Sequence, residues 1–236
     1  MNKREIKMNI EIQSNTSSEN IKVNHLKRFI GVIVAPIKTM EDIAKAPSIL
    51  IPGIIVALGF FILGIGRFTL YRDVFLSDIT SQLPVAQRNT AAIIELIKSP
   101  LEDVIGWIVY SLIYFIPIKL LKGGSTYKHI LSINGYVYMY KIIYYVACLF
   151  VSFYTGQMFF QDSLVTVFPF LQGVKGFNSY IYGYLNATSI CAMLQFIVVA
   201  IGLKKVTNLK PKIVYCIVFI PYIISLSIEA FYAINV

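Results

Sequence analysis

Five long apolar runs constrain the fold of this chain more than any other feature. Each run is close to the roughly 20 residues that an α-helix needs to cross a bilayer core at about 1.5 Å per residue. The runs cover residues 48–70, 103–121, 131–154, 184–203 and 213–233. They predict an all-α, polytopic membrane protein, a bundle of five transmembrane helices with an N-terminal interfacial helical segment.

Composition excludes an ordinary soluble domain. The 236 residues are 57% hydrophobic and 14% charged, whereas soluble domains carry about a quarter of charged residues. The three cysteines Cys148, Cys191 and Cys216 fall inside apolar runs and lack CxxC spacing. This pattern favours small buried hydrophobes over a disulfide framework or a zinc site.

The N-terminal region precedes the first run and divides into two parts. Residues 1–28 are polar, without the apolar core of a signal peptide, and predict a disordered basic cytoplasmic tail ahead of a membrane domain at 29–236. Residues 26–46 are amphipathic in places and broken at Pro36, which suits the first turn of a second short helix. We expect this segment to lie along the inner membrane interface.

Basic residues predict the orientation of the bundle. Most of the 21 Lys and Arg residues lie in the tail and in the loops after the second and fourth runs, and cytoplasmic loops retain such residues. The N-terminus is therefore expected on the cytoplasmic side of a bacterial plasma membrane, and the C-terminus on its outer side. The basic face should attract anionic lipids, whereas groups that would read or stack on nucleic acid are not visible.

The predicted outer loop, residues 155–183, is rich in aromatic residues and carries few charges. Such a loop is typical of an aromatic belt resting on the membrane surface. The alternative is a partner-binding surface.

Three short motifs follow one another along the chain: APIKTMEDIAKAP at 35–47, GGSTYKHILSINGY at 123–136 and IGLKKVTNLKPK at 201–212. Their order and spacing resemble the bacterial form of the Yip1 domain family (the Ypt-interacting proteins), from about Phe29 to the C-terminus. The resemblance implies a five-span membrane domain rather than a particular activity.

Glycines within and near these motifs have expected structural roles. Gly123 and Gly124 permit a tight turn with positive φ between the second and third runs. Gly135 and Gly53 would let neighbouring helices approach closely.

Catalytic signatures are missing from the sequence. HExxH, G-x-S-x-G and P-loop patterns do not occur. The acidic pairs Glu41/Asp42 and Glu102/Asp103 stand near predicted helix starts, where capping explains them. The sequence therefore predicts no enzyme activity, no catalytic residue, no cofactor and no metal site.

Polar residues inside the apolar runs are the candidate functional positions, because charge at mid-bilayer is costly. Lys141 lies about 15 Å along the third run, and Gln195 lies at a similar depth in the fourth. A pocket could hold an anionic lipid headgroup or a substrate; alternatively, Lys141 snorkels to an interface and the tyrosines pack between helices. The pocket would consist of Lys141, Tyr136, Tyr140, Tyr144 and Gln195.

Near the outer face, Arg67 and Glu229 fall at comparable depth and predict an ion pair. The leading functional hypothesis is a non-enzymatic accessory or scaffold protein for another membrane system, such as an ABC exporter. Its partners would be the bilayer, anionic lipids and another membrane protein. The alternative is a small lipid or solute carrier that uses the Lys141 pocket, although paired broken helices and an inverted repeat are not visible.

Overall fold

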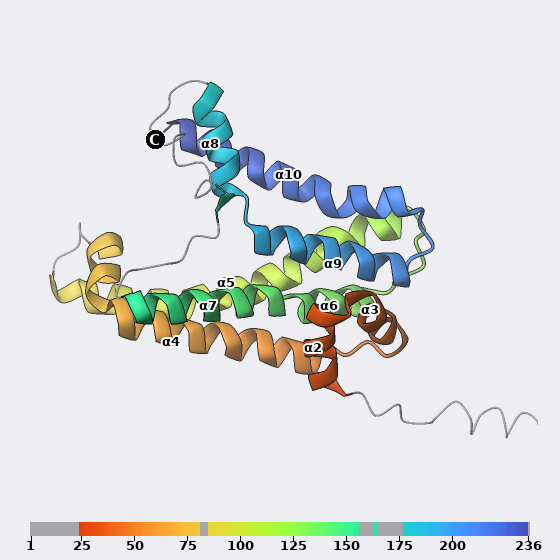
Figure 1. Cartoon of the computed structure of the whole chain (residues 1–236), viewed down its shortest axis with the longest axis horizontal. Coiled ribbons are helices and arrows are strands. Elements are labelled where there is room, and N and C mark those ends of the chain that lie inside the picture. The colour runs from red at the N-terminus through yellow and green to blue at the C-terminus, as the bar shows by residue number, and fades with distance from the viewer. Residues whose placement is uncertain (1–23, 81–84, 156–162, 165–176, 236) are drawn as a thin grey trace, which may run out of the picture.

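The computed structural model describes residues 24–80, 85–155, 163–164 and 177–235, and every regular element in these ranges is helical. Helices gather at one end of the long axis and spread towards the other (Figure 1). The described N-terminal helices and the C-terminus lie at opposite ends of that axis (Figure 1).

Two short helices form the N-terminal hairpin. α2 (His25–Val34) is capped by the Asn24 side chain, which accepts a hydrogen bond from the Lys27 amide at 3.0 Å. α3 (Pro36–Lys45) begins at Pro36, so the predicted break at this proline is confirmed. The first residues of α2 belong to the predicted tail, whose residues up to 23 lie outside the described part of the chain.

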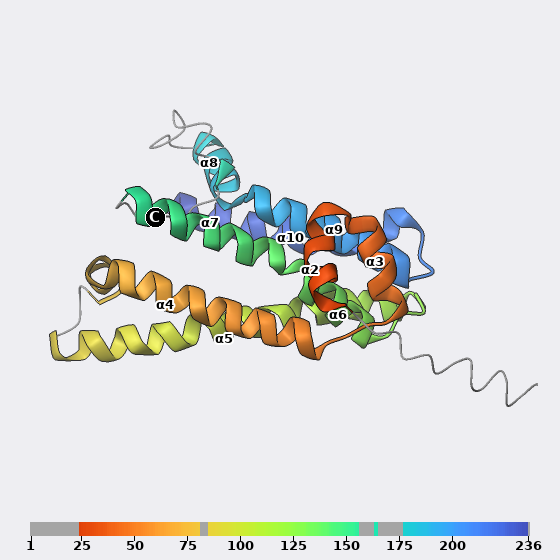
Figure 2. The same cartoon turned by 60° about the horizontal axis from the view of Figure 1, so that its bottom comes forward.

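Two long helices run side by side in the next part of the chain: α4 (Leu50–Thr80) and α5 (Val85–Leu120) (Figure 2). α5 begins well before residue 103, and its apolar part covers Leu96–Leu120. The prediction that Glu102 and Asp103 stand at a helix start is therefore wrong. Isoleucines 93, 94 and 97 extend the apolar pattern upstream and keep both acids inside the helix.

The third apolar run folds as two successive helices. α6 (Tyr127–Val137) and α7 (Met139–Thr155) are separated by a turn at Tyr138. Together they provide a candidate span over Tyr127–Thr155.

The fourth run is bent. α8 (Phe177–Ala187) and α9 (Ile190–Val206) meet at 65° across Thr188 and Ser189, and the Ser189 side chain caps α9 by accepting a hydrogen bond from the Ala192 amide. α10 (Pro211–Asn235) completes the described chain and packs along α8 and α9.

Among the described residues, three helical segments are long and apolar enough to cross a membrane: Leu96–Leu120, Tyr127–Thr155 and Pro211–Ile228. The bent pair formed by α8 and α9 makes a fourth if it counts as one span, and the apolar part of α4, Leu50–Gly66, is shorter. The described chain is thus all-helical with several membrane-spanning candidates, while the count of five stays a prediction.

α6 lies at the centre of the packed end. Its residues from Ile130 to Val137 are all buried. α2, α3, α5 and α9 contact it, and α10 adds Val214, Ile217 and Val218 to the same apolar core. A second cluster joins α4, α5 and α7 through Phe60, Trp107 and Ile142.

Candidate functional site

Arg28 joins the two helices of the N-terminal hairpin. Its side chain is 2% exposed, and its Nε donates to the Asp42 carboxylate at 2.6 Å. The two terminal nitrogens donate to the carbonyl oxygens of Ala46 at 2.7 Å and Asp42 at 2.9 Å. A buried guanidinium is tolerated when its donors are satisfied, and Arg28 in this way also caps the carbonyl end of α3.

Tyr136 of α6 contacts three residues of the hairpin. Its hydroxyl lies 2.6 Å from Nδ1 of His25, and the Arg28 guanidinium carbon lies 5.8 Å from its ring centroid. Phe29 packs on the same ring at 4.8 Å between centroids. Burial, and then the neighbouring Arg28 charge, lower the pKa of His25 below its usual value. The neutral imidazole is therefore the form that fits this contact.

Further contacts fix the hairpin against α6, α7 and α9. The Tyr140 hydroxyl donates to the Val32 carbonyl at 2.9 Å, and the Ser48 amide donates to Ser132 Oγ at 3.0 Å. Glu41 pairs with Lys205 at 2.6 Å, and this lysine lowers the pKa of Glu41 by hydrogen bonding and by its charge.

A buried polar network links α5 and α6. The indole nitrogen of Trp107 donates to the Leu131 carbonyl at 3.0 Å. The Asn134 amide donates to the Trp107 carbonyl at 3.1 Å and to Ser111 Oγ at 3.0 Å. The donors of Trp107, Ser111 and Asn134 are all paired, so the network specifies how the two helices align.

Two predicted packing glycines face this network. A methyl group added to Gly135 would lie 3.0 Å from Pro52 and 3.2 Å from the Trp107 ring. One added to Gly53 would lie 3.0 Å from the same ring. Glycine at both positions therefore lets the indole fill the space between α4 and α6.

Lys141 pairs with Asp103 across α7 and α5. Its ammonium contacts the Asp103 carboxylate, and the two side chains are 35% and 17% exposed. Three aromatic rings surround the same ammonium: Phe60 at 5.3 Å, Tyr145 at 5.8 Å and Tyr138 at 6.0 Å from their centroids. The pair and the rings together neutralise and shield the charge.

The five residues of the predicted pocket contact different parts of the bundle. Tyr136 and Tyr140 contact the hairpin, whereas Lys141 contacts α4 and α5. Tyr144 packs on Tyr145 at 5.5 Å between centroids, and Gln195 is half-buried on α9. Binding of a ligand by these five residues stays a prediction.

The predicted ion pair between Arg67 and Glu229 lies outside the described side chains, although α4 and α10, which carry the two residues, are described. The pairing stays a prediction.

The turn between α5 and α6 is tied to the turn between α9 and α10. Gly124 has φ +76° and Lys122 has φ +56°. The Gly123 carbonyl accepts a hydrogen bond from the backbone amide of Asn208 at 2.9 Å. A methyl group on Gly123 would lie 2.7 Å from the Ile118 side chain, so this glycine allows the turn to close on α5. Exposed lysines surround these turns, namely Lys119, Lys122, Lys128, Lys204, Lys210 and Lys212.

Sequence reasoning missed Arg28, Asp103, Trp107 and Asn134 as organising residues. Trp107, the single tryptophan, carried a usable signal, because a tryptophan one or more turns inside an apolar run needs a partner for its N–H. Arg28 also carried a usable signal, because its spacing places it on the same helix face as the apolar Val32.

The polar contacts described above join and align helices. In the described residues, groups of three or more His, Cys, Asp or Glu that could hold a metal ion do not occur. The buried and half-buried charges described above are paired, so they join helices instead of presenting a reactive group.

Comparison with known proteins identifies a family for the chain. The Yip1 domain family profile matches residues 30–231. Membrane protein YknW of Bacillus subtilis (strain 168) is 27% identical over 214 residues, which cover 86% of this chain and 86% of that protein. No solved structure matches the chain. The match begins within α2 and covers nearly all of the helical bundle, including α3 and α6, and the chain therefore belongs to the Yip1 domain family.

Proposed function

We propose that this protein is a non-enzymatic accessory or scaffold protein for another membrane system, such as an ABC exporter. It would lie in the bacterial plasma membrane with its lysine-rich end in the cytoplasm. This end carries the α5–α6 and α9–α10 turns and the exposed lysines around them. The contrast between its interior and its surface carries the proposal. Polar groups of the described core join its helices, whereas long apolar helix faces point outwards.

The outward apolar faces are extensive. On α10, Ile220, Ile223, Ile224 and Ile228 are each more than half exposed. α5 presents a similar row that includes Ile105 and Ile116. Lipid or a second membrane protein can cover such faces, and a scaffold needs faces of this kind.

Crosslinking in native membranes tests the accessory role. A photo-reactive amino acid in place of Ile224, on α10, should capture the same membrane protein in repeated experiments. The same amino acid in place of Ile116, on the exposed face of α5, tests a second face for comparison. Lys141→Ala should leave that capture unchanged, because Lys141 contacts Asp103 inside the bundle. Gentle-detergent preparations that always contain this chain without a partner would contradict the scaffold role.

A second candidate function is binding or transport of an anionic lipid or solute at Lys141. One observation favours it: an ammonium within the candidate span Tyr127–Thr155 retains 35% exposure of its side chain. An anionic lipid that copurifies with the wild type and is lost in Lys141→Met would support this candidate. Vesicles that show no lipid or solute movement above empty controls would remove the transport function.

A further inference from the structure

The N-terminal hairpin presents a second apolar surface that is separate from the one packed on α6. Leu26, Ile30, Ile33 and Val34 form one stripe on α2, with exposures of 70%, 57%, 41% and 77%. Their spacing of four, seven and eight residues places them on one helix face. Arg28, Phe29 and Val32 occupy the opposite, buried face.

The buried face is fixed, so the outer stripe cannot turn into the core. Arg28 ties α2 to the end of α3, and Tyr140 holds the Val32 carbonyl. The stripe is therefore a permanent surface of the folded chain, and its occupant must come from outside the described bundle.

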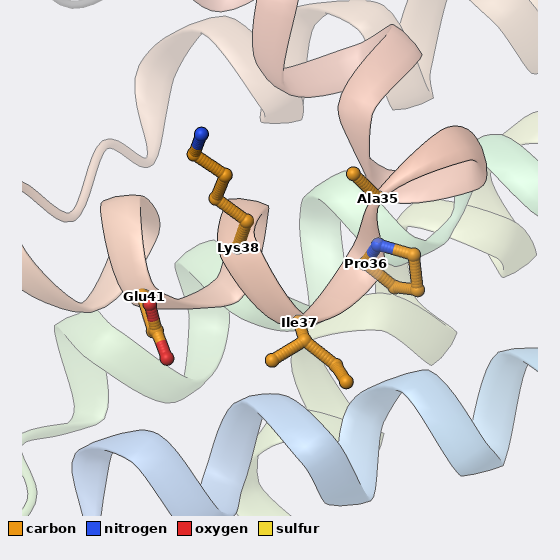
Figure 3. Close-up of a pocket in the computed structure, with 5 residues that line it drawn as sticks. All are labelled: Ala35, Pro36, Ile37, Lys38 and Glu41. Atoms are coloured by element: carbon orange, nitrogen blue, oxygen red, sulfur yellow. The ribbon is translucent and has the colours of Figure 1, made fainter.

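Two adjoining grooves extend this surface onto α3. One, of about 390 Å³, is lined by residues from Asn24 to Ala35 that include Leu26, Lys27 and Val34. The other, of about 450 Å³, is lined by Ala35, Pro36, Ile37, Lys38 and Glu41. Figure 3 shows Lys38 and Glu41 leaving α3 in opposite directions, with Glu41 on the side of α9.

Charge around the grooves is positive. Lys27 and Lys38 are exposed, one in each groove, while the Glu41 carboxylate is paired with Lys205. α2 also runs across the direction of the long helices at the lysine-rich end (Figure 1). An in-plane helix with an apolar stripe flanked by lysines is the pattern of an interfacial helix on anionic lipid.

We infer that the outer face of α2 and the first turn of α3 form a binding surface for an anionic bilayer leaflet. The stripe of Leu26, Ile30, Ile33 and Val34 enters the boundary between headgroups and acyl chains. Lys27 and Lys38 contact lipid phosphates. This inference concerns the non-spanning hairpin and does not depend on the accessory role.

Site-specific fluorescence tests the inference on the full-length protein. Cys216 is exposed, so the prediction that it is buried is wrong. The variant Val34→Cys is therefore labelled with an environment-sensitive dye in a background where Cys216 is serine. The labelled protein is placed in nanodiscs of phosphatidylcholine, with or without phosphatidylglycerol. The background without Val34→Cys gives the signal from the remaining cysteines, and Thr126→Cys, an exposed polar position at the same end, is the matched control.

The expected result is strong quenching of the Val34 label by lipids that carry a shallow quencher, and protection from iodide. Phosphatidylglycerol should increase the lipid quenching, and Lys27→Gln with Lys38→Gln should reduce that increase at least about twofold. The paired substitutions Lys128→Gln and Lys212→Gln, at exposed lysines away from the grooves, should leave it unchanged.

Three results would overturn the inference. A Val34 label that iodide quenches as strongly as the Thr126 label means that the stripe faces water. Protection from iodide without quenching by lipid means that a protein, a second copy included, covers the stripe. Lipid quenching that is equal in both bilayers removes the anionic leaflet as the ligand.

Discussion

α6 and α7 are consecutive parts of one candidate span, yet α6 is mostly buried and α7 is largely exposed. Every residue of α6 from Ile130 to Val137 is buried, and helices from both ends of the sequence surround it. In α7 the buried residues are Ile142, Cys148 and Ser152, whereas Phe150 and Phe153 are each 73% exposed. The difference places the closest packing around α6, at the lysine-rich end, and leaves much of the α7 surface exposed.

Gly135→Leu should have the largest effect on the α6 end. The added side chain would meet Pro52 and the Trp107 ring, so the free energy of unfolding should fall by about 3 kcal/mol. Reversible unfolding in mixed micelles by SDS titration measures the change. Ala147→Leu on the exposed face of α7 is the control and should be close to neutral. Equal losses in both variants would refute the contrast between the two halves.

Arg28→Met should loosen the N-terminal hairpin, because Arg28 joins α2 to the end of α3. Three hydrogen bonds are lost, but the Asp42 carboxylate is 55% exposed and can be hydrated. The expected loss is about 2 kcal/mol, below the range for a fully buried pair. Faster amide hydrogen exchange in α2 and α3 would report it. Lys98→Met removes an ion pair exposed on both sides and should leave that exchange unaltered.

Asn134→Leu should weaken the alignment of α5 and α6. Two donated hydrogen bonds disappear, and the Ser111 hydroxyl still donates to the Trp107 carbonyl. A loss of about 1 kcal/mol is expected in the same unfolding titration. A variant as stable as the wild type would mean that the network does not contribute to packing.

Acidification should have the smallest effect, and it should be confined to α2. The pKa of His25 is lower in the folded chain than its usual value of about 6.5. The folded contact therefore contributes fully above pH 6.5, and this contribution is lost as the pH falls below it. Amide exchange in α2 should speed up at pH 5.5 relative to pH 7.5, and His25→Gln should abolish the difference. A pH response that survives in His25→Gln would assign it to another group.

Local features of the sequence predicted the parts of the fold that depend on local physics. Apolar runs indicated helices, and Pro36 marked the start of α3. Each of these inferences needed only the residue and its immediate neighbours. The predicted boundaries of the second and fourth runs were less accurate. Apolar residues continue upstream of residue 103 in the second run, and a helix cap at Ser189 interrupts the fourth.

Partners distant in sequence could not be predicted in the same way. Lys141 stood out as a charge in an apolar run, but Asp103 lies 38 positions earlier and was assigned to a helix end. Arg28 was grouped with the cations of the tail, although its contacts are those of a core residue. These pairings arise from the arrangement of helices, which periodicity and composition do not encode.

The docking of the hairpin also sets an order of events during synthesis. His25 meets Tyr136, which is 111 positions later in the chain, and Met40 lies against the still later Gly202. At about 5–20 residues per second, the ribosome needs several seconds or more to deliver α6 and longer to deliver α9. Through that interval Phe29 lacks the Tyr136 ring, and Met40 lacks the part of α9 around Gly202. α2 and α3 are thus the first described helices to be made, and their packing can be completed only after α6 and α9 have followed.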